Sequence, residues 1–257
     1  RLHEAAETLY HFFWGEIADW YLELVKPRFR DDADAASRAA AQATLVEALD
    51  GVFRLLHPVV PFVSEALWRR LPAPAGVERE ASLVGAKWPE RRPEREDAGA
   101  EERMTALMDL IGAVRAIRSE YNVPPSQKVT VRLSNVPAVL RDALAAEERA
   151  LRRLAGVESV DMTGERAAGE AGASAVLRGG AEVFLPLEGI IDLERERERL
   201  GKELARIEGL LRSTEGKLAN ENFVSRAPAE VVEREREKLA SYRDQRDKLS
   251  QKLAALG

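Results

Sequence analysis

The chain has 257 residues, which is enough for two or three domains with cores of their own. It contains no cysteine, which excludes disulfides, thiolate metal sites and cysteine nucleophiles and favours a reducing, cytoplasmic location. No apolar run approaches the roughly 20 residues of a membrane helix, so we expect no membrane contact. The net charge of −5 is unusual for a general nucleic-acid-binding protein, which is expected to be basic. The chain starts at Arg1 and not at Met, so we expect it to be part of a larger protein.

The first half of the sequence has the periodicity of long helices. Apolar residues recur at spacings of three and four over residues 2–26, 34–56 and 98–120, and Pro61 suits the start of a shorter helix. Pro27 should end the first helix, because proline disfavours helical geometry in the preceding residue. Residues 72–97 are predicted to form a long irregular segment, here called the excursion. We expect Trp88-Pro89 to anchor it against the helices. We therefore expect an antiparallel helical bundle over residues 1–125.

Residues 126–190 change to a period of two. Alternating apolar residues at 129–133 predict a strand, 140–154 returns to helical spacing, and 157–160 is a second short strand. A hairpin is predicted about Gly179-Gly180, and the stretch 164–173 is expected to be a flexible loop. These elements predict a small β-α-β-β subdomain.

Residues 191–257 carry two apolar heptad runs joined by a short turn at 220–227. Such a pattern predicts an antiparallel coiled-coil hairpin that projects about 40 Å, at ~1.5 Å per residue. Glu235 and Arg246 fall at seam positions of the second helix, and we expect both to reach out to solvent. The predicted fold is therefore mainly α: a helical bundle at 1–125, a small α/β subdomain at 126–190 and a coiled-coil arm at 191–257.

No catalytic or metal-binding constellation is recognisable in the sequence. His3 and His11 are eight residues apart, too far for a metal pair one turn apart on a helix. His57 precedes Pro58 at a helix end, where it could interact with the last carbonyl groups. We expect no catalytic residue, no metal ion and no cofactor in this chain.

Five aromatic residues crowd the first helix within ten positions: Phe12, Phe13, Trp14, Trp20 and Tyr21. They could all be core side chains of the bundle. Alternatively, one or two rings could stand out and stack on an unpaired base. Trp14 lies off the apolar stripe of Leu9, Phe13 and Ile17, so it is the better candidate for stacking.

The charge of the predicted arm differs from that of the rest. Residues 192–257 hold 15 Lys/Arg and 14 Asp/Glu, a net charge of +1, so the acidity lies elsewhere. These charges could simply be a salt-bridged helical surface. Alternatively, the cationic residues of the first arm helix and the turn could follow a phosphate backbone. That set is Lys202, Arg206, Arg212, Lys217 and Arg226.

Several segments together resemble valyl-tRNA synthetases. Residues 12–23 are similar to a bundle helix with an F-x-W…D-W-Y-L-E pattern, and residues 111–123 are similar to the segment that leads into the small domain. Residues 56–68 match an L-H-P-x-x-P-F-x-x-E-x-L-W signature that valyl, isoleucyl and leucyl enzymes share. Residues 217–232 resemble the tip of the valyl arm, which makes the likeness specific.

The resemblance implies an anticodon-binding bundle, a linker domain and a tRNA-binding arm, with tRNA(Val) as partner and no role for DNA. It adds Arg115 and Arg118 to Trp14 as candidate anticodon-binding residues. The intact enzymes use ATP and Mg²⁺, but no H-I-G-H-like or K-M-S-K-S-like segment occurs in this sequence. The resemblance thus implies a monomeric part that binds tRNA and does not catalyse. The competing hypothesis, which the acidic net charge favours, is a protein-interaction module with the hairpin as a docking strut.

Overall fold

The computed structural model describes residues 1–30, 33–73, 76, 78, 80–164 and 170–256. By its internal contacts the chain divides into two compact units, Arg1–Glu96 and Asp97–Gly257. The expected bundle boundary near residue 125 does not coincide with this division, because the helix from Ala98 groups with the second unit. The three-domain division itself stays a prediction.

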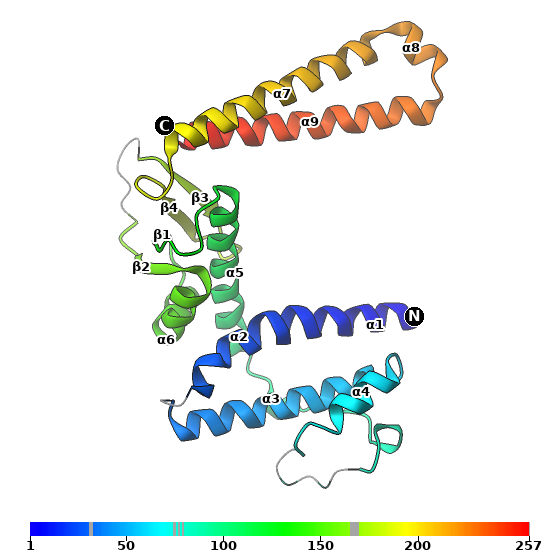
Figure 1. Ribbon diagram of the computed structural model, residues 1–257, viewed down its shortest axis with the longest axis vertical. Coiled ribbons are helices and arrows are strands. Elements are labelled where there is room, and N and C mark those ends of the chain that lie inside the picture. Colours follow the sequence, from blue (N-terminus) through cyan, green and yellow to red (C-terminus); the bar gives the residue numbers. More distant parts are fainter. Residues whose placement is uncertain (31–32, 74–75, 77, 79, 165–169, 257) are drawn as a thin grey trace. The chain divides into compact units, whose positions relative to one another are not determined.

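The first unit starts with one continuous helical rod that changes its winding (Figure 1). Helix α1 (Leu2–His11) continues as a π-helical stretch η1 (Phe12–Tyr21), then as α2 (Leu22–Val25) and a 3-10 turn η2 (Lys26–Phe29). The α-helical part ends at Val25, one residue before the predicted end, and Pro27 lies at the start of the 3-10 turn that follows, where proline is tolerated.

The rod packs against α3 (Ala35–Leu56), and the Tyr21 hydroxyl donates to the Ala41 carbonyl at 3.4 Å. Asp34 caps α3 by accepting a hydrogen bond from the Ser37 N–H at 2.7 Å, as expected for a polar residue before a helix. Ala41, Val52 and Phe53 are the buried residues of this helix.

Helix α4 (Pro61–Trp68) closes a small core with α3 and the excursion that follows. Phe53, Trp68 and Leu83 form its centre, with Leu83 in the short 3-10 turn η3 (Leu83–Gly85). A second such turn, η4 (Pro93–Arg95), comes near the end of the unit. Trp88 was expected to pin the excursion, but its side chain is exposed and Leu83 occupies the core instead.

A polar network surrounds this core. The Trp68 Nε1–H donates to Asp50 Oδ1 at 2.6 Å, and Arg54 donates to Asp50 Oδ2 at 2.7 Å and to Glu80 Oε2 at 3.0 Å. The Arg54 side chain is only 11% exposed. The hydrogen bond that Arg54 donates to Glu80 lowers the pKa of this carboxyl group to about 2. The network thus ties the excursion to α3 through a largely buried guanidinium.

The second unit is built on α5 (Ala98–Glu120) and a four-stranded sheet. Its strands are β1 (Val129–Ser134), β2 (Val157–Asp161), β3 (Gly172–Val176) and β4 (Glu182–Pro186), in the order β2-β1-β4-β3. β1 pairs parallel to β2 across α6 (Ala138–Ala155) and antiparallel to β4. The two predicted strands on either side of the helix and the predicted hairpin are all present, and together they make up this four-stranded sheet. Of the expected 164–173 loop, residues 165–169 lie outside the described residues, and Gly172 and Ala173 belong to β3.

The core of the sheet is well predicted by its alternation. Val129, Val131 and Leu133 are all buried, and α5 and α6 pack against each other beside the sheet. Gly172 is fixed by close packing: a Cβ there would lie 2.6 Å from the Leu185 carbonyl oxygen and against the Phe184 ring. The strand therefore needs glycine at this position.

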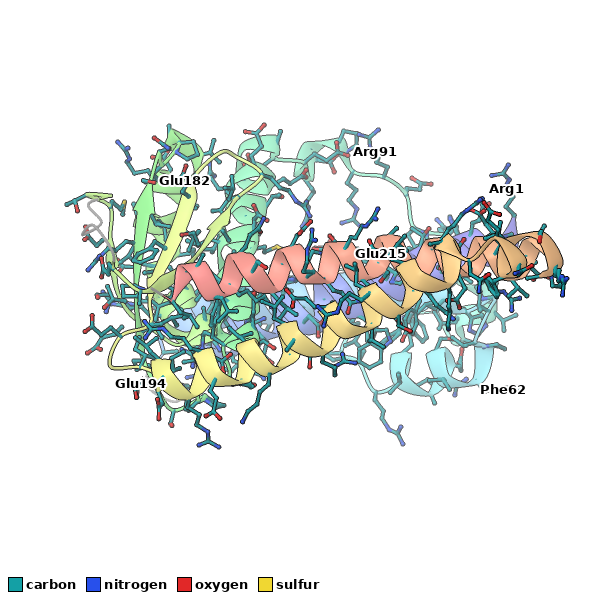
Figure 2. The ribbon with its side chains drawn as sticks, turned by 90° about the horizontal axis from the view of Figure 1, so that it is seen from above. Arg1, Phe62, Arg91, Glu182, Glu194 and Glu215 are labelled. Atoms are coloured by element: carbon teal, nitrogen blue, oxygen red, sulfur yellow. The ribbon has the colours of Figure 1, made fainter. Side chains whose placement is uncertain are left out.

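The arm consists of α7 (Leu193–Ala219), a short α8 (Glu221–Arg226) and α9 (Ala229–Ala255). Figure 2 shows α7 and α9 side by side, with Glu194 at the root and Glu215 farther out on α7. The predicted hairpin is confirmed, with the added helix α8 in the turn. At the root, Lys252 pairs with Glu120 of α5 at 2.8 Å, and Arg197 donates to the Leu256 carbonyl at 3.1 Å.

The prediction for the polar seam residues is wrong for Glu235. Its side chain is 10% exposed and pairs with Lys238 at 2.7 Å and with Lys217 of the opposite helix at 3.7 Å. The Lys238 hydrogen bond is the main cause that holds the pKa of Glu235 below its ordinary value. Arg246 does reach outward, where it binds Asp247. The ammonium groups of Lys217 and Lys238 at the edge of the seam thus compensate the charge of Glu235, which was expected to reach solvent.

The low pKa of Glu80 predicts a specific loss of stability in acid. The stabilisation by Glu80 is fully present above its unfolded-state pKa of about 4.5 and disappears as pH falls through about 2. Glu80→Gln should therefore unfold more easily than the wild type at pH 7, by about 1 kcal/mol, and equally easily near pH 2. All four tryptophans lie in the first unit, so tryptophan fluorescence during urea unfolding follows this unit alone. A difference that persists unchanged at pH 2 would contradict the assignment. Glu94→Gln, an exposed carboxylate of η4, is the control.

Gly172→Ala should destabilise the second unit by about 2 kcal/mol, because the added methyl group collides with backbone that cannot move away. Gly179→Ala is the matched control in the β3–β4 connection, since its Cβ would meet only Pro137 at an ordinary 3.6 Å. Thermal unfolding followed by far-ultraviolet circular dichroism measures both variants. Equal melting temperatures for the two would show that the β3–β4 packing is looser than the structure indicates.

Candidate nucleic-acid interface

The exposed aromatic surface lies on the rod of the first unit. Tyr10, Phe12 and Trp14 are all exposed, and the Trp14 side chain is 51% accessible. Tyr10 and Trp14 have ring centroids 6.2 Å apart, and Phe13 meets Trp14 edge-on at 5.6 Å. Trp14 is thus held by two neighbouring rings and still presents a large apolar area to solvent. This is the arrangement that a base-stacking side chain requires.

Arg115 and Arg118 are placed differently from Trp14, because both contact backbone of the second unit. Arg115 donates Nε to the Leu154 carbonyl in the last turn of α6 at 2.9 Å. Arg118 donates to the carbonyls of Gln127 and Pro124, both at 2.9 Å, and of Gly156 at 3.3 Å. Burial lowers the pKa of Arg118. These contacts assign both arginines a structural role, and their role in binding stays a prediction.

Three of the five arm cations already have carboxylate partners. Lys202 pairs with Glu198 at 2.6 Å and Arg206 with Glu203 at 2.7 Å, both along α7, and Lys217 reaches Glu235 across the seam. The two exposed pairs along α7 contribute only about 0–1 kcal/mol each, so a phosphate can replace their carboxylates at little cost. Lys217 differs, because Glu235 is only 10% exposed and would keep Lys238 as its one partner. The two hypotheses of a salt-bridged surface and a phosphate track are therefore compatible.

Arg212 and Arg226 are the uncommitted members of the arm set. Arg212 lies on α7 and Arg226 ends α8 at the tip, and both are exposed. Within the described part of the chain neither guanidinium has a hydrogen bond or an ion pair. These two groups are available for a ligand without breaking any contact.

The residues of the L-H-P signature support the fold of the first unit. His57 Nδ1 lies 2.9 Å from Ser64 Oγ, and not at a helix-end carbonyl as expected. Glu65 Oε2 accepts hydrogen bonds from the Leu83 N–H at 2.9 Å and from the Ser82 hydroxyl at 3.1 Å. The signature thus fixes α4 to α3 and to the excursion.

One surface was not predicted at all. The outer side of α4 and the turn before it expose five large apolar side chains, with Phe62 89% accessible (Figure 2). They are Val59, Val60, Phe62, Val63 and Leu67. The sequence signal was present, because this short segment is apolar on more than one face, but periodicity alone does not say which face stays uncovered.

No group of three or more His, Asp or Glu side chains in the described part of the chain could hold a metal ion. None of the helices described is both long and apolar enough to cross a bilayer.

Comparison with known families gives two matches that cover most of the chain. Residues 1–133 match the anticodon-binding domain of tRNA ligases, and residues 192–257 match the valyl-tRNA synthetase tRNA-binding arm.

Curated relatives agree with these matches. A valine–tRNA ligase of Mesorhizobium japonicum is 41% identical over 97% of this chain, and one of Brucella suis is 42% identical over 95%. One of Geobacillus kaustophilus is 37% identical over 98%. The chain spans only 26%, 26% and 28% of these ligases.

The hydrogen bonds of Arg118 predict that its replacement first lowers the stability of the second unit. Arg118→Ala leaves several carbonyl groups without their donor and should destabilise the second unit by about 2 kcal/mol. Arg149→Ala, an exposed arginine of α6, is the control and should change stability by less than about 0.5 kcal/mol. Calorimetric unfolding measures both. An Arg118→Ala protein as stable as the wild type would mean that the arginine is free to serve another purpose.

Proposed function

Because this chain belongs to the anticodon-binding domain family of tRNA ligases and carries a valyl-type arm, we propose that it binds tRNA(Val). The exposed aromatic surface of the rod contacts unpaired anticodon bases, and the arm contacts the backbone of the tRNA body. The observation that carries this proposal is the pairing of two chemically different surfaces in one chain: an exposed tryptophan and a row of solvent-accessible cations.

Stacking on Trp14 suits the anticodon because its bases are unpaired and can be splayed onto a ring. Base–aromatic stacking is worth about 1–3 kcal/mol per base and tolerates any base identity. Trp14 therefore supplies affinity for an unpaired loop, and hydrogen bonds to base edges must supply the choice among anticodons.

The arm suits paired RNA because side chains cannot read the deep, narrow major groove of an A-form helix. Contacts to phosphates position such a helix without reading its sequence. Arg212 and Arg226 are ready for such contacts, and Lys202 and Arg206 become available by exchange of their exposed carboxylate partners. Lys217 becomes available when Glu235 is left to Lys238 alone.

The activity of the relatives extends beyond what this chain contains. We propose that the chain works as the tRNA-binding part of a cytoplasmic, monomeric valine–tRNA ligase, which attaches valine to its tRNA with ATP and Mg²⁺. The chain itself contributes binding and no catalytic residue. Binding energy gained far from the reaction helps to position the acceptor end of the tRNA.

The alternative function, a docking module for another protein, has one observation in its favour. The uncovered apolar side of α4 is typical of protein contacts and not of RNA contacts. It lies in a different unit from the arm, so it supports a strut role for the hairpin only weakly.

Alanine substitutions should separate the two surfaces. Each alanine substitution in the arm should weaken the binding of all tRNAs about equally. The residues to replace are Lys202, Arg206, Arg212, Lys217 and Arg226. Each lost phosphate contact should lower the slope of log affinity against log salt by roughly 0.7–0.9. Trp14→Ala should weaken a tRNA with an unpaired anticodon loop by about 5-fold to 100-fold, and should have much less effect on a tRNA from which that loop has been removed. Filter binding across a salt series measures both effects.

Arg149→Ala removes one exposed positive charge from α6 and controls for net charge. Arm variants with the affinity and salt slope of the wild type would make the hairpin a strut and favour the docking module. If Trp14→Ala weakened tRNAs with and without the anticodon loop equally, the rod would not contact the anticodon.

A further inference from the structure

A cleft of about 630 Å³ opens at the root of the arm, within the second unit. One wall is aliphatic and consists of Pro124, Ile190 and Ile191. Tyr121 and Asn122, which follow directly after α5, form a second side, and the first turns of α7 form the third. Its volume lies within the range of about 300–1,000 Å³ that is typical of pockets for small ligands. We refer to it as the arm-root cleft.

Three polar groups of this cleft have no partner among the described residues: the Tyr121 hydroxyl, the Asn122 carboxamide and the Arg195 guanidinium. Tyr121 is only 5% exposed, so its ring is packed away. A buried phenol normally has a hydrogen-bond partner. The Tyr121 hydroxyl is not among the unpartnered side-chain atoms that are sealed from solvent, and Tyr121 belongs to the lining of the cleft. An unsatisfied, nearly buried donor beside an aliphatic wall indicates a place for a ligand.

The backbone at this place is also unusual. Asn122 has φ of 51°, a left-handed conformation that asparagine tolerates better than most residues but glycine tolerates best. Unlike glycine, asparagine brings a carboxamide to this position, and with it a donor and an acceptor in the lining of the cleft.

The charges of the cleft restrict the ligand. Arg199 is held by Glu196 at 2.8 Å and Lys202 by Glu198 at 2.6 Å, and Asp192 caps α7. Arg195 and Asp192 are the charged side chains of the lining that have no ion-pair partner among the described residues, so three cations face three carboxylates. This balance gives a polyphosphate no net attraction, whereas a single phosphodiester is matched by the one guanidinium without an ion pair.

We propose that the arm-root cleft takes up one unpaired nucleotide of the bound tRNA, with its base against the aliphatic wall and its phosphate beside Arg195. The base edge then meets the Tyr121 hydroxyl and the Asn122 carboxamide. A paired helix does not fit into a cleft of this size, but a splayed nucleotide does, and splayed nucleotides are the parts of RNA that proteins read by base edges. This inference rests on the proposed function and adds a second kind of contact to the arm.

Three variants test the cleft in the full chain with a tRNA(Val) transcript. Tyr121→Phe removes only the free hydroxyl and should weaken binding about 3-fold to 10-fold without changing the salt slope. Asn122→Gly keeps the left-handed backbone, removes the carboxamide and should weaken binding similarly. Arg195→Gln should weaken binding and also lower the salt slope by roughly 0.7. Tyr242→Phe, which removes a hydroxyl from α9 outside the cleft lining, is the matched control and should bind like the wild type.

A series of tRNA(Val) molecules with one abasic site each, placed in turn at every unpaired position, identifies the nucleotide. At one position, loss of the base should weaken the wild type but have little further effect on Tyr121→Phe, as in a double-mutant cycle. Melting temperatures close to the wild type for Tyr121→Phe would show that the fold is intact.

The outcomes distinguish the two proposals. If the wild type binds and the arm cations matter, but the three cleft variants bind normally, the cleft inference is wrong and the proposed function stands. If every abasic position is additive with Tyr121→Phe, no base enters the cleft. If the wild type does not bind tRNA at all, both proposals are wrong.

Discussion

The guanidinium of Arg118 is the contact on which the arrangement of the second unit depends. It joins the end of α5 and the Pro124–Gln127 turn that follows to the connection between α6 and β2, which lies 38 residues further along the chain. Gly156 leaves the room for it, because a Cβ at that left-handed position would lie 2.9 Å from the guanidinium. Where α5 ends determines where Tyr121 and Asn122 lie, and Glu120 in turn holds Lys252 at the root of the arm.

The arm has a different construction, because two helices alone provide only one apolar seam. Leu200, Ile207, Leu211 and Val232 are buried in or beside it, and Glu235 is enclosed there through two lysines. A polar group at a seam position favours one register over others, since a shifted register would leave the carboxylate without partners. The stability of the hairpin is therefore limited by its thinness, and its register is specified by charge.

Much of this fold could be predicted from the sequence. The bounds of α3, α5 and α7 follow from aspartate caps and from the spacing of apolar residues, and the β3–β4 hairpin follows from its paired glycines. The π-helical stretch could not be predicted, because no residue type marks the wider winding.

The candidate site shows the same limit. Trp14 is exposed, as its position off the apolar stripe indicated. The contacts of Arg115 and Arg118 could not be foreseen, because their acceptors are carbonyl groups, which every residue carries and no sequence pattern distinguishes. Three separate segments form the arm-root cleft, and no pattern in the sequence indicates it.

The acidic net charge, which argued against an RNA-binding role, has little weight once the pairing of charges is known. Most arm carboxylates hold a lysine or arginine within one helical turn, so their field is cancelled locally and screened within about 10 Å at 0.1 M salt. A phosphate that approaches such a surface replaces one anion by another at each cation. The carboxylate it displaces returns to water at a cost of at most about 1 kcal/mol, while the RNA releases its condensed counterions. What decides RNA binding is therefore the number of cations that can exchange or are free, and not the sum of charges along the chain.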